Sequence, residues 1–336
     1  MMAMTYWHFL FAALAAFGFS FGLARYMTQP GSLGFVLDEP NHRSMHSTPT
    51  PRSGGLGFVI VLLLMGTLMA VRGSLDGAWV PAALLLAGVS YADDRGGLSV
   101  RWRLIAHLLA AGLLCLSARD LLPGLVPFLG LAGGAVVAFL ATVWLINLYN
   151  FMDGMDGFAG GMAVFGFGAL ALAGWRLGLV EFAGFNTVLA CAVLGFLCFN
   201  FPPARIFMGD VGSAVLGFAV AVVGFWGLRQ GIHWSVPAAA FAPFWVDATL
   251  TLIKRTRRGE KIWVAHADHY YQQLVRAGWP KRRVVLGEYA LMAVSGLAAL
   301  GLALQPAWSW PIVAGLAVVY LGLLALCHGR WLRARR

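Results

Sequence analysis

The residues best suited to chemistry are oxygen-bearing side chains that recur at short spacing in a mostly apolar chain. Asn147, Asn150, Asp153 and Asp156 stand at every third position. If one helix continues through them, all four project near one face. Oxygen ligands of this kind suit a hard divalent cation, a nucleotide, or both. An EF-hand does not fit, because Gly154 directly follows the first aspartate and no glutamate closes the loop.

Two adjacent carboxylates stand in a second polar segment. Asp93 and Asp94 repel one another unless a cation or a raised pKa relieves them, so a metal or a proton-transfer role is indicated. Arg101 and Arg103 follow closely. They could hold a pyrophosphate, or they could simply anchor a helix end at the membrane interface.

Three further segments combine aromatic, basic and histidine residues. Asp210 stands alone in FMGDVGS, three residues after Phe207. The segment 28–54 carries His46 and Arg52, which can donate to phosphate oxygens. The basic segment 254–283 carries His266 and His269. Binding of anionic lipid head groups would account for its lysines and arginines, but not for the two histidines.

The chain as a whole has the composition of a membrane protein. Hydrophobic residues make up 60% and charged residues 11%, with a mean hydropathy of +0.76. Soluble domains have about a quarter charged residues. We predict a single all-α integral-membrane domain, residues 1–336, with about eleven transmembrane helices, each long enough to cross or nearly cross a bilayer core of about 30 Å. The apolar stretches are 5–27, 55–71, 77–92, 104–118, 128–148, 157–175, 182–199, 213–228, 234–253, 284–304 and 308–328.

The distribution of positive charge predicts the orientation of these helices. With the N-terminus periplasmic and the C-terminus cytoplasmic, the outer side receives few of the chain's 24 Lys and Arg residues, namely Arg72, Arg119, Arg176 and Arg229. This asymmetry fits the positive-inside rule. It also accounts for the net charge of +10 without nucleic acid as a partner. The polar segments 28–54, 93–103, 147–157, 200–213 and 254–283 then share the cytoplasmic side.

Five motifs, in order along nearly the whole chain, resemble the polyprenyl-phosphate N-acetylhexosamine-1-phosphate transferases, glycosyltransferase family 4. They are PNHRSMHSTPTPRSGG, the Asp93-Asp94 pair with its arginines, NLYNFMDGMDGFAGG, FMGDVGS and HADHYYQQLV. The form HADHYYQQL is most similar to the branch that initiates lipopolysaccharide O-antigen. It departs from the triple-histidine loop of the phospho-MurNAc-pentapeptide translocase, which disfavours a MurNAc-pentapeptide donor.

The resemblance implies a reaction and its participants. A UDP-N-acetylhexosamine would give its sugar-1-phosphate to undecaprenyl phosphate with release of UMP, at the cytoplasmic face of the bacterial inner membrane and among membrane lipids. This would be the first membrane step of O-antigen or a related surface glycan, with Mg²⁺ or Mn²⁺ as cofactor. The donor sugar stays open, as does the choice between direct attack and a covalent aspartyl intermediate. The oligomeric state is also open, with a homodimer among the alternatives.

The resemblance also implies roles for individual residues. Asp93, Asp94 and Asp210 would be catalytic, with Asp93 handling the acceptor phosphate. Asp210 would bind the metal, with Asn150 as a second ligand. Phe207 would stack on uracil. The expected substrate-binding residues are Asn147, Asn150, Asp153, Asp156, Phe207, Arg52, His46, Arg101, Arg103, His266 and His269.

Three other classes of protein compete with this interpretation. A membrane transporter could use the clustered acids as an ion pathway, although the hydropathy pattern shows no internal repeat. A CDP-alcohol phosphatidyltransferase shares an acidic Asp-Gly signature, but its Ala-Arg and later D-x-x-x-D do not follow here. A membrane scaffold without chemistry does not account for the dense polar loops.

Overall fold

The chain is almost entirely helical. The computed structural model describes residues 4–32, 35–39, 48–261 and 267–334. In this part of the chain the β structure is one antiparallel pair, β1 (Val36–Asp38) with β2 (Thr50–Arg52). The helices are α1 (Tyr6–Met27), α2 (Leu56–Val71), α3 (Trp79–Gly96), α4 (Val100–Ser117), α5 (Leu122–Leu125), η1 (Pro127–Leu129), α6 (Gly130–Met152), α7 (Phe158–Arg176), α8 (Val180–Asn200), α9 (Asp210–Arg229), α10 (Ser235–Ala240), α11 (Ala242–Arg257), α12 (Tyr270–Arg276), α13 (Lys281–Leu304), η2 (Pro306–Trp308) and α14 (Ser309–Ala334). The all-α prediction is confirmed.

The apolar composition of the helices makes this a polytopic membrane protein. Within the described residues, eight helices are long and apolar enough to cross a membrane: α1, α4, α6, α7, α8, α9, α13 and the stretch Pro306–Cys327. Each corresponds to a predicted span. The predicted spans 55–71 and 77–92 correspond to α2, which is a shorter apolar helix, and to α3, which carries Asp93 and Asp94 in its last turns.

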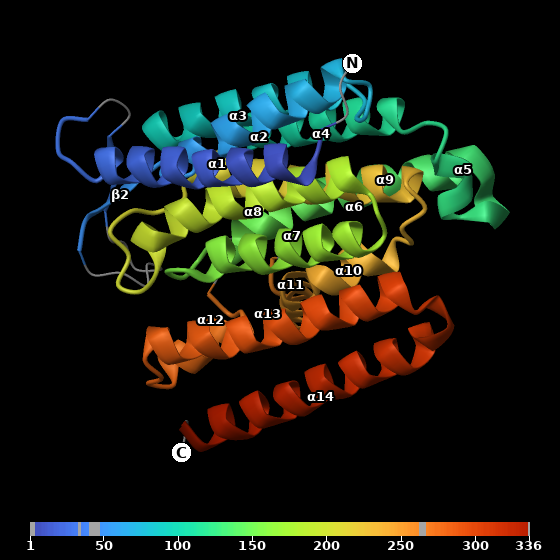
Figure 1. The fold of residues 1–336 in the computed structure, drawn as a ribbon. Coiled ribbons are helices and arrows are strands. Elements are labelled where there is room, and N and C mark those ends of the chain that lie inside the picture. Colours follow the sequence, from blue (N-terminus) through green and yellow to red (C-terminus); the bar gives the residue numbers. More distant parts are fainter. Residues whose placement is uncertain (1–3, 33–34, 40–47, 262–266, 335–336) are drawn as a thin grey trace.

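The prediction that residues 234–253 form one continuous span was wrong, because two helices occupy this stretch. The chain breaks at Phe241, between α10 and α11, where φ is −104° and ψ is 15°. Pro243 then stands in the first turn of α11, the place where a helix tolerates proline because that N–H would have no helical partner. Figure 1 shows α11 nearly along its axis, while α9 and α13 lie across the view. The break therefore turns α11 out of the direction of the bundle.

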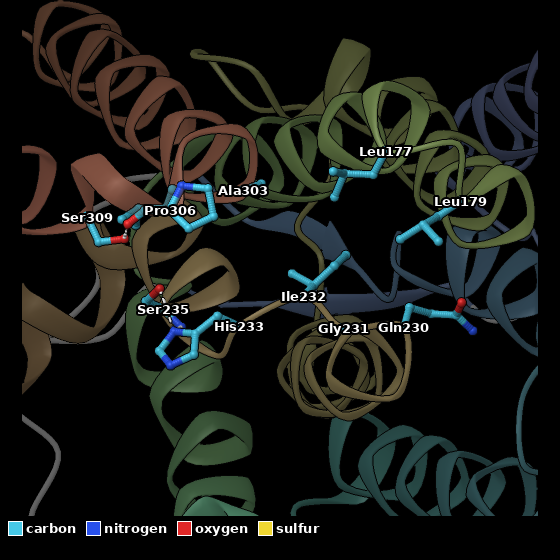
Figure 2. A pocket seen from close by; sticks show the side chains of 11 residues that line it. Leu177, Leu179, Gln230, Gly231, Ile232, His233, Ser235, Ala303, Pro306 and Ser309 are labelled. Atoms are coloured by element: carbon cyan, nitrogen blue, oxygen red, sulfur yellow. Dashed lines mark hydrogen bonds between the residues drawn. The ribbon is translucent and has the colours of Figure 1, made fainter.

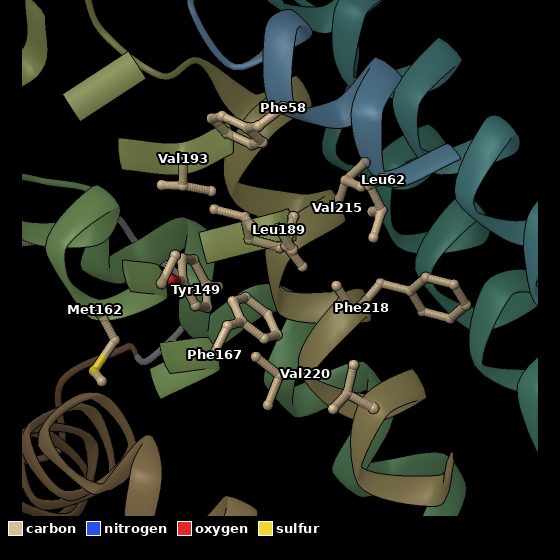
Figure 3. Close-up of a cluster of buried hydrophobic side chains, with 14 of the residues drawn as sticks. Phe58, Leu62, Tyr149, Met162, Phe167, Leu189, Val193, Val215, Phe218 and Val220 are labelled. Atoms are coloured by element: carbon tan, nitrogen blue, oxygen red, sulfur yellow. The ribbon is translucent and has the colours of Figure 1, made fainter. Parts of the chain in front are cut away.

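Helices α8 and α9 form the centre of the bundle. Their most apolar windows are 78% and 83% buried within the protein, against 6% for the stretch that includes α14. α1 packs on α8 with a stripe of mostly small residues at helical spacing: Phe9, Ala13, Ala16, Ser20, Ala24 and Met27. Small side chains let helices approach closely, which is how helices associate when lipid is their solvent. Figure 3 shows the core, where Phe58, Tyr149, Phe167, Leu189 and Val215 meet from five helices.

The two ends of the bundle differ in character. The described parts of the polar segments 28–54, 93–103, 147–157, 200–213 and 254–283 gather at one end, on the left of Figure 1, which we name the loop end. A cavity of about 420 Å³ opens at the opposite end, where the links α7–α8 and α9–α10 meet α13 and η2 (Figure 2). His233 and Ser235 face one another there, with 2.9 Å between Nδ1 and Oγ. None of the residues that line this cavity is a predicted site residue.

Candidate active site

Asp94 holds the start of α9 from another helix. It lies near the end of α3, and its carboxylate accepts the main-chain N–H of Asp210 at 3.0 Å and of Val211 at 3.1 Å. These N–H groups open α9, so they have no helical partner and carry the positive end of the helix dipole. The Asp94 side chain is 1% exposed. It therefore serves as the N-terminal cap of α9 and fixes the place of Asp210.

Two glycines make this close approach possible. Gly209 has φ +76°, and a Cβ there would stand 2.7 Å from Oδ2 of Asp94. At the start of α2, a Cβ on Gly55 would stand 2.5 Å from the Cα of Gly212. Both distances are shorter than any carbon contact allows. The glycines of SGG and FMGDVGS are thus required by the packing of α2, α3 and α9.

Main-chain hydrogen bonds join the first loop to the FMGD segment. The Phe207 N–H donates to Pro51 at 2.7 Å, and the Gly54 N–H donates back to Phe207 at 2.9 Å. Gly55 continues the pattern by donating to Met208. These bonds bring Arg52 to the carboxylates of α3.

Arg52 connects the first loop to Asp94. Its guanidinium donates to the main-chain oxygen of Asp94, and its Nε lies 3.9 Å from the carboxylate of the same residue. A second ion pair joins its Nη1 to Asp38 at 3.6 Å. Arg52 is 30% exposed, so it also borders solvent at the loop end.

Arg103 bridges two carboxylates that come from different motifs. Its Nη1 donates to Oδ2 of Asp93 at 3.0 Å and to Oδ2 of Asp210 at 3.2 Å. Asp93 also accepts the N–H of Leu98, which holds the α3–α4 turn. The Arg103 and Asp210 side chains are 35% and 31% exposed, so the bridge is open to a ligand from solvent.

The Asn and Asp residues of the third motif do not lie on one continuous helix, which corrects the expectation from their spacing. α6 ends at Met152, and Asp153 has a non-helical ψ of 53°. Asn150, on the last turn of α6, donates from Nδ2 to Ser213 Oγ on α9 at 3.2 Å. Asn147 donates to the Val143 carbonyl one turn earlier in the same helix.

Asp156 contacts the segment after α8 and the start of α13. Its carboxylate accepts the Ala204 N–H at 3.2 Å and lies 3.6 Å from Nζ of Lys281, at the start of α13. The loop is held further by Gly157, whose N–H donates to Asn200 Oδ1 and whose carbonyl accepts the Tyr289 hydroxyl at 2.7 Å. The segment 153–157 is therefore fixed by α8 and α13 together.

Negative charge is concentrated where these loops meet. The pKa of the Asp153 carboxyl is raised from 3.8 to about 8, mainly by burial and then by the negative charges of Asp210, Asp94 and Asp156. The part of this shift that comes from the three neighbouring carboxylates shows that their negative charges act on one another at this place.

The donor set fits a divalent cation in its chemistry. Carboxylate and amide oxygens are the ligands that Mg²⁺ takes, and the excess of negative charge would favour it. Among the residues that the structure describes, however, no three His, Cys, Asp or Glu side chains are grouped closely enough to hold a metal ion. The guanidinium of Arg103 lies between Asp93 and Asp210 instead.

The other predicted site residues are distributed as follows. Phe207 is half-buried three residues before Asp210, and Arg101 is exposed two residues before Arg103 in α4. His269 is 3% exposed and contacts Asp247 of α11. His46 and His266 lie outside the described residues.

The sequence did not predict the contacts that Asp247, Ser213 and Lys281 make with the motif residues. A lone acid in the apolar stretch 234–253 was the available signal for Asp247. Ser213 and Lys281 had no comparable signal, because their partners are distant in sequence.

Comparison with known proteins identifies the class to which this fold and site belong. Residues 77–227 match the model of glycosyl transferase family 4. The decaprenyl-phosphate N-acetylglucosaminephosphotransferase of Mycobacterium tuberculosis is 30% identical, over 85% of this chain and 80% of its own. The chain therefore belongs to glycosyl transferase family 4, the polyprenyl-phosphate sugar-phosphate transferases that its motifs resemble.

Relatives with two different named activities match it over similar lengths. A probable undecaprenyl-phosphate N-acetylglucosaminyl 1-phosphate transferase of Bacillus subtilis is 26% identical, over 88% of this chain and 85% of its own. A phospho-N-acetylmuramoyl-pentapeptide-transferase of Acaryochloris marina is 33% identical, over 80% of this chain and 78% of its own.

Proposed function

We propose that the protein transfers N-acetylhexosamine-1-phosphate from a UDP-sugar to undecaprenyl phosphate and releases UMP. The observation that carries this proposal is the Arg103 bridge between Asp93 and Asp210, with Asp94 capping the helix that Asp210 begins. It joins carboxylates of two motifs at one end of a membrane bundle, where a water-soluble donor and a lipid acceptor can meet. Transport is disfavoured by the same arrangement, because the hydrogen bonds and ion pairs gather these acids at the start of α9, and the segments that carry them share one end of the bundle.

The proposed roles follow from charge and position. Phosphoryl transfer depends mainly on positioning and on neutralising charge. Arg103 and Arg52 can each turn a guanidinium from a carboxylate to a phosphate oxygen, since both are about one-third exposed. Asp93 would orient the acceptor phosphate from its place beside Arg103. Phe207 would stack on the uracil, an interaction that contributes about 1–3 kcal/mol per base.

Magnesium is proposed as the cofactor, with Asp210 and Asn150 as the residues that would hold it. When bound, Mg²⁺ would neutralise the pyrophosphate and make UMP a better leaving group. Asn150 and Asp210 are brought together by the Asn150–Ser213 hydrogen bond at the start of α9. Asp153, on the neighbouring loop, would help to hold the nucleotide.

The donor and the pathway are the finer parts of the proposal. The names of the mycobacterial and Bacillus relatives specify N-acetylglucosamine, so UDP-N-acetylglucosamine is the first donor to test. A 6-deoxy-N-acetylhexosamine donor is the second, and the product would start O-antigen or a related surface glycan.

A donor panel tests the reaction itself. Purified protein in detergent, with undecaprenyl phosphate and Mg²⁺, is expected to release UMP from a UDP-N-acetylhexosamine and to form the lipid-linked product. UMP release is measured by chromatography and the lipid product by mass spectrometry. Omission of undecaprenyl phosphate is the control for hydrolysis. Release of UDP in place of UMP would show an ordinary glycosyltransferase and contradict the proposal.

Labelling of cysteines tests the proposed cytoplasmic position of the loop end. Asp120 and Arg258 are exposed at opposite ends, at 59% and 58% of their side chains. In a variant without native cysteines, a maleimide that cannot cross membranes should label Asp120→Cys in intact cells. Arg258→Cys should react only after the membrane is permeabilised. Labelling of Arg258→Cys in intact cells would place the loop end outside and contradict this orientation.

A further inference from the structure

The carboxylate of Asp247 holds the beginning of α12. Asp247 lies in α11, and its side chain is 11% exposed. Both of its oxygens accept the Tyr270 N–H at 3.1 Å, and Thr251 Oγ1 donates to Oδ1 at 3.0 Å. His269 Nδ1 lies 3.2 Å from the same Oδ1. One carboxylate of α11 thus fixes two consecutive residues of a loop more than twenty positions away.

The contact with Asp247 orients the imidazole of His269. An ionised carboxylate only accepts hydrogen bonds, so this contact places the proton of His269 on Nδ1. Carboxylates that accept from one ring nitrogen set the tautomer and the orientation of functional histidines. The His269 ring is stacked on Tyr271, with 5.8 Å between ring centroids and 12° between planes.

Beyond His269, α12 packs directly against the loop that carries Asp153. Tyr271 is fully buried, and its ring centroid is 4.4 Å from that of Phe158 at the start of α7. The Tyr271 hydroxyl lies against Gly154, and a Cβ on Gly154 would stand 3.0 Å from Nε2 of Gln272. The packing leaves no room for a side chain at position 154, directly after Asp153.

The carboxylates of Asp247 and Asp153 both lie near enough to the buried hydroxyl of Tyr271 to affect its pKa. Burial raises the pKa of Tyr271 well above its ordinary value, and the negative charges of Asp247 and Asp153 raise it further. The hydroxyl therefore keeps its proton at neutral pH. This neutral hydroxyl lies against Gly154, the residue after Asp153.

We infer that Asp247 is a positioning residue for the proposed transfer, because it holds His269 and the Tyr270 N–H, keeps Tyr271 and Gln272 against Gly154, and so fixes the loop of Asp153. This inference rests on the proposed function. Within the described residues, no hydrogen bond or ion pair joins Asp247 to Asp93, Asp94 or Asp210. Its effect on the reaction is transmitted through α12 and not by contact with the reacting groups.

Kinetics of Asp247 variants test the effect on the reaction. Asp247→Asn is expected to lower kcat/KM for the UDP-sugar by about 10²-fold, the cost of displacing a positioned group by about 1 Å. Asp247→Glu should restore part of the activity. The matched control is Asp268→Asn, which removes a carboxylate one residue from His269 but leaves its partner Arg255 paired with Glu260 at 2.7 Å. That control should stay within a fewfold of wild type, and equal losses in both variants would overturn the inference.

Two replacements of His269 distinguish the roles of its two ring nitrogens. Asparagine keeps a donor near the place of Nδ1, whereas glutamine keeps one near Nε2. If Asp247 acts by orienting the ring, Asp247→Asn should add no further loss to His269→Gln and should still impair His269→Asn. Additive losses in both backgrounds, with lowered thermal stability, would show a purely structural role and contradict the inference.

Hydrogen exchange tests the clamp independently of activity. In Asp247→Ala, and more weakly in Asp247→Asn, the amides of the peptide 267–276 should exchange faster than in wild type, while those of α8 should not change. Unchanged protection of this peptide would overturn the clamp even if the enzyme is active. Faster exchange in a protein without activity on any donor would support the clamp and show that the proposed function, not the contact, has failed.

Discussion

Replacing Asp210 with asparagine is expected to lower turnover by about 10²–10³-fold, the effect of losing one charged group that stabilises a transition state. The change removes the negative charge that pairs with Arg103 and that would attract a divalent cation. It should leave the helix start intact, because Asp94 binds the main-chain N–H of residue 210 and not its side chain. The loss of turnover is measured as UMP release by the variant and by wild type over a range of Mg²⁺ concentrations.

Asp120→Asn is the matched control for that variant. It makes the same chemical change at the opposite end, where Asp120 pairs with Arg229. Its activity should equal that of wild type. If Asp210→Asn keeps near wild-type activity at low Mg²⁺, the assignment of Asp210 as a metal ligand is wrong.

Substitutions of the two adjacent aspartates of α3 are expected to have different effects on stability. Asp94→Ala should abolish activity and also lower thermal stability, because it leaves the N–H groups of Asp210 and Val211 unpaired in a buried place. Each unpaired group costs roughly 1–3 kcal/mol. Asp93→Asn should be inactive as well, but it should melt near wild type and still bind the UDP-sugar.

Thermal melting with and without UDP-sugar separates these two outcomes. Asp94→Asn keeps an oxygen that can accept one of the two N–H groups, so its stability should fall between the others. An Asp94→Ala variant that melts like wild type would show that the cap does not hold α9 in place.

The membrane-spanning helices and the grouping of the loops could be predicted from the sequence. Hydropathy reports burial in lipid directly, because a bilayer admits helices whose backbone groups are paired internally. The asymmetry of Arg and Lys placed the loops on one side. Pro243 lies in an apolar run, so hydropathy alone could not show the break at Phe241 or the turn of α11.

The detailed pairing in the site could not be predicted, for two physical reasons. The spacing of three in the third motif predicted one continuous helix. The helix ends at Met152 instead, because the loop after it is held by Asn200 and Tyr289. The two adjacent aspartates look equivalent in sequence. Only the tertiary structure shows that one caps α9 and the other faces Arg103.

The hydrogen bond from Tyr289 to the Gly157 carbonyl joins residues 132 positions apart, and it bears on how the protein is made. A ribosome that has delivered residues 1–157 to the membrane has already produced Asp93, Asp94 and Asp153, but not α9, α12 or α13. In the nascent chain at this stage, those carboxylates lack the helices that later hold them. The loop 153–157 is therefore completed late in biogenesis, when α13 enters the membrane. A chain truncated after α9 would contain Asp93, Asp94 and Asp210 but would lack Tyr289 and Lys281, which hold that loop.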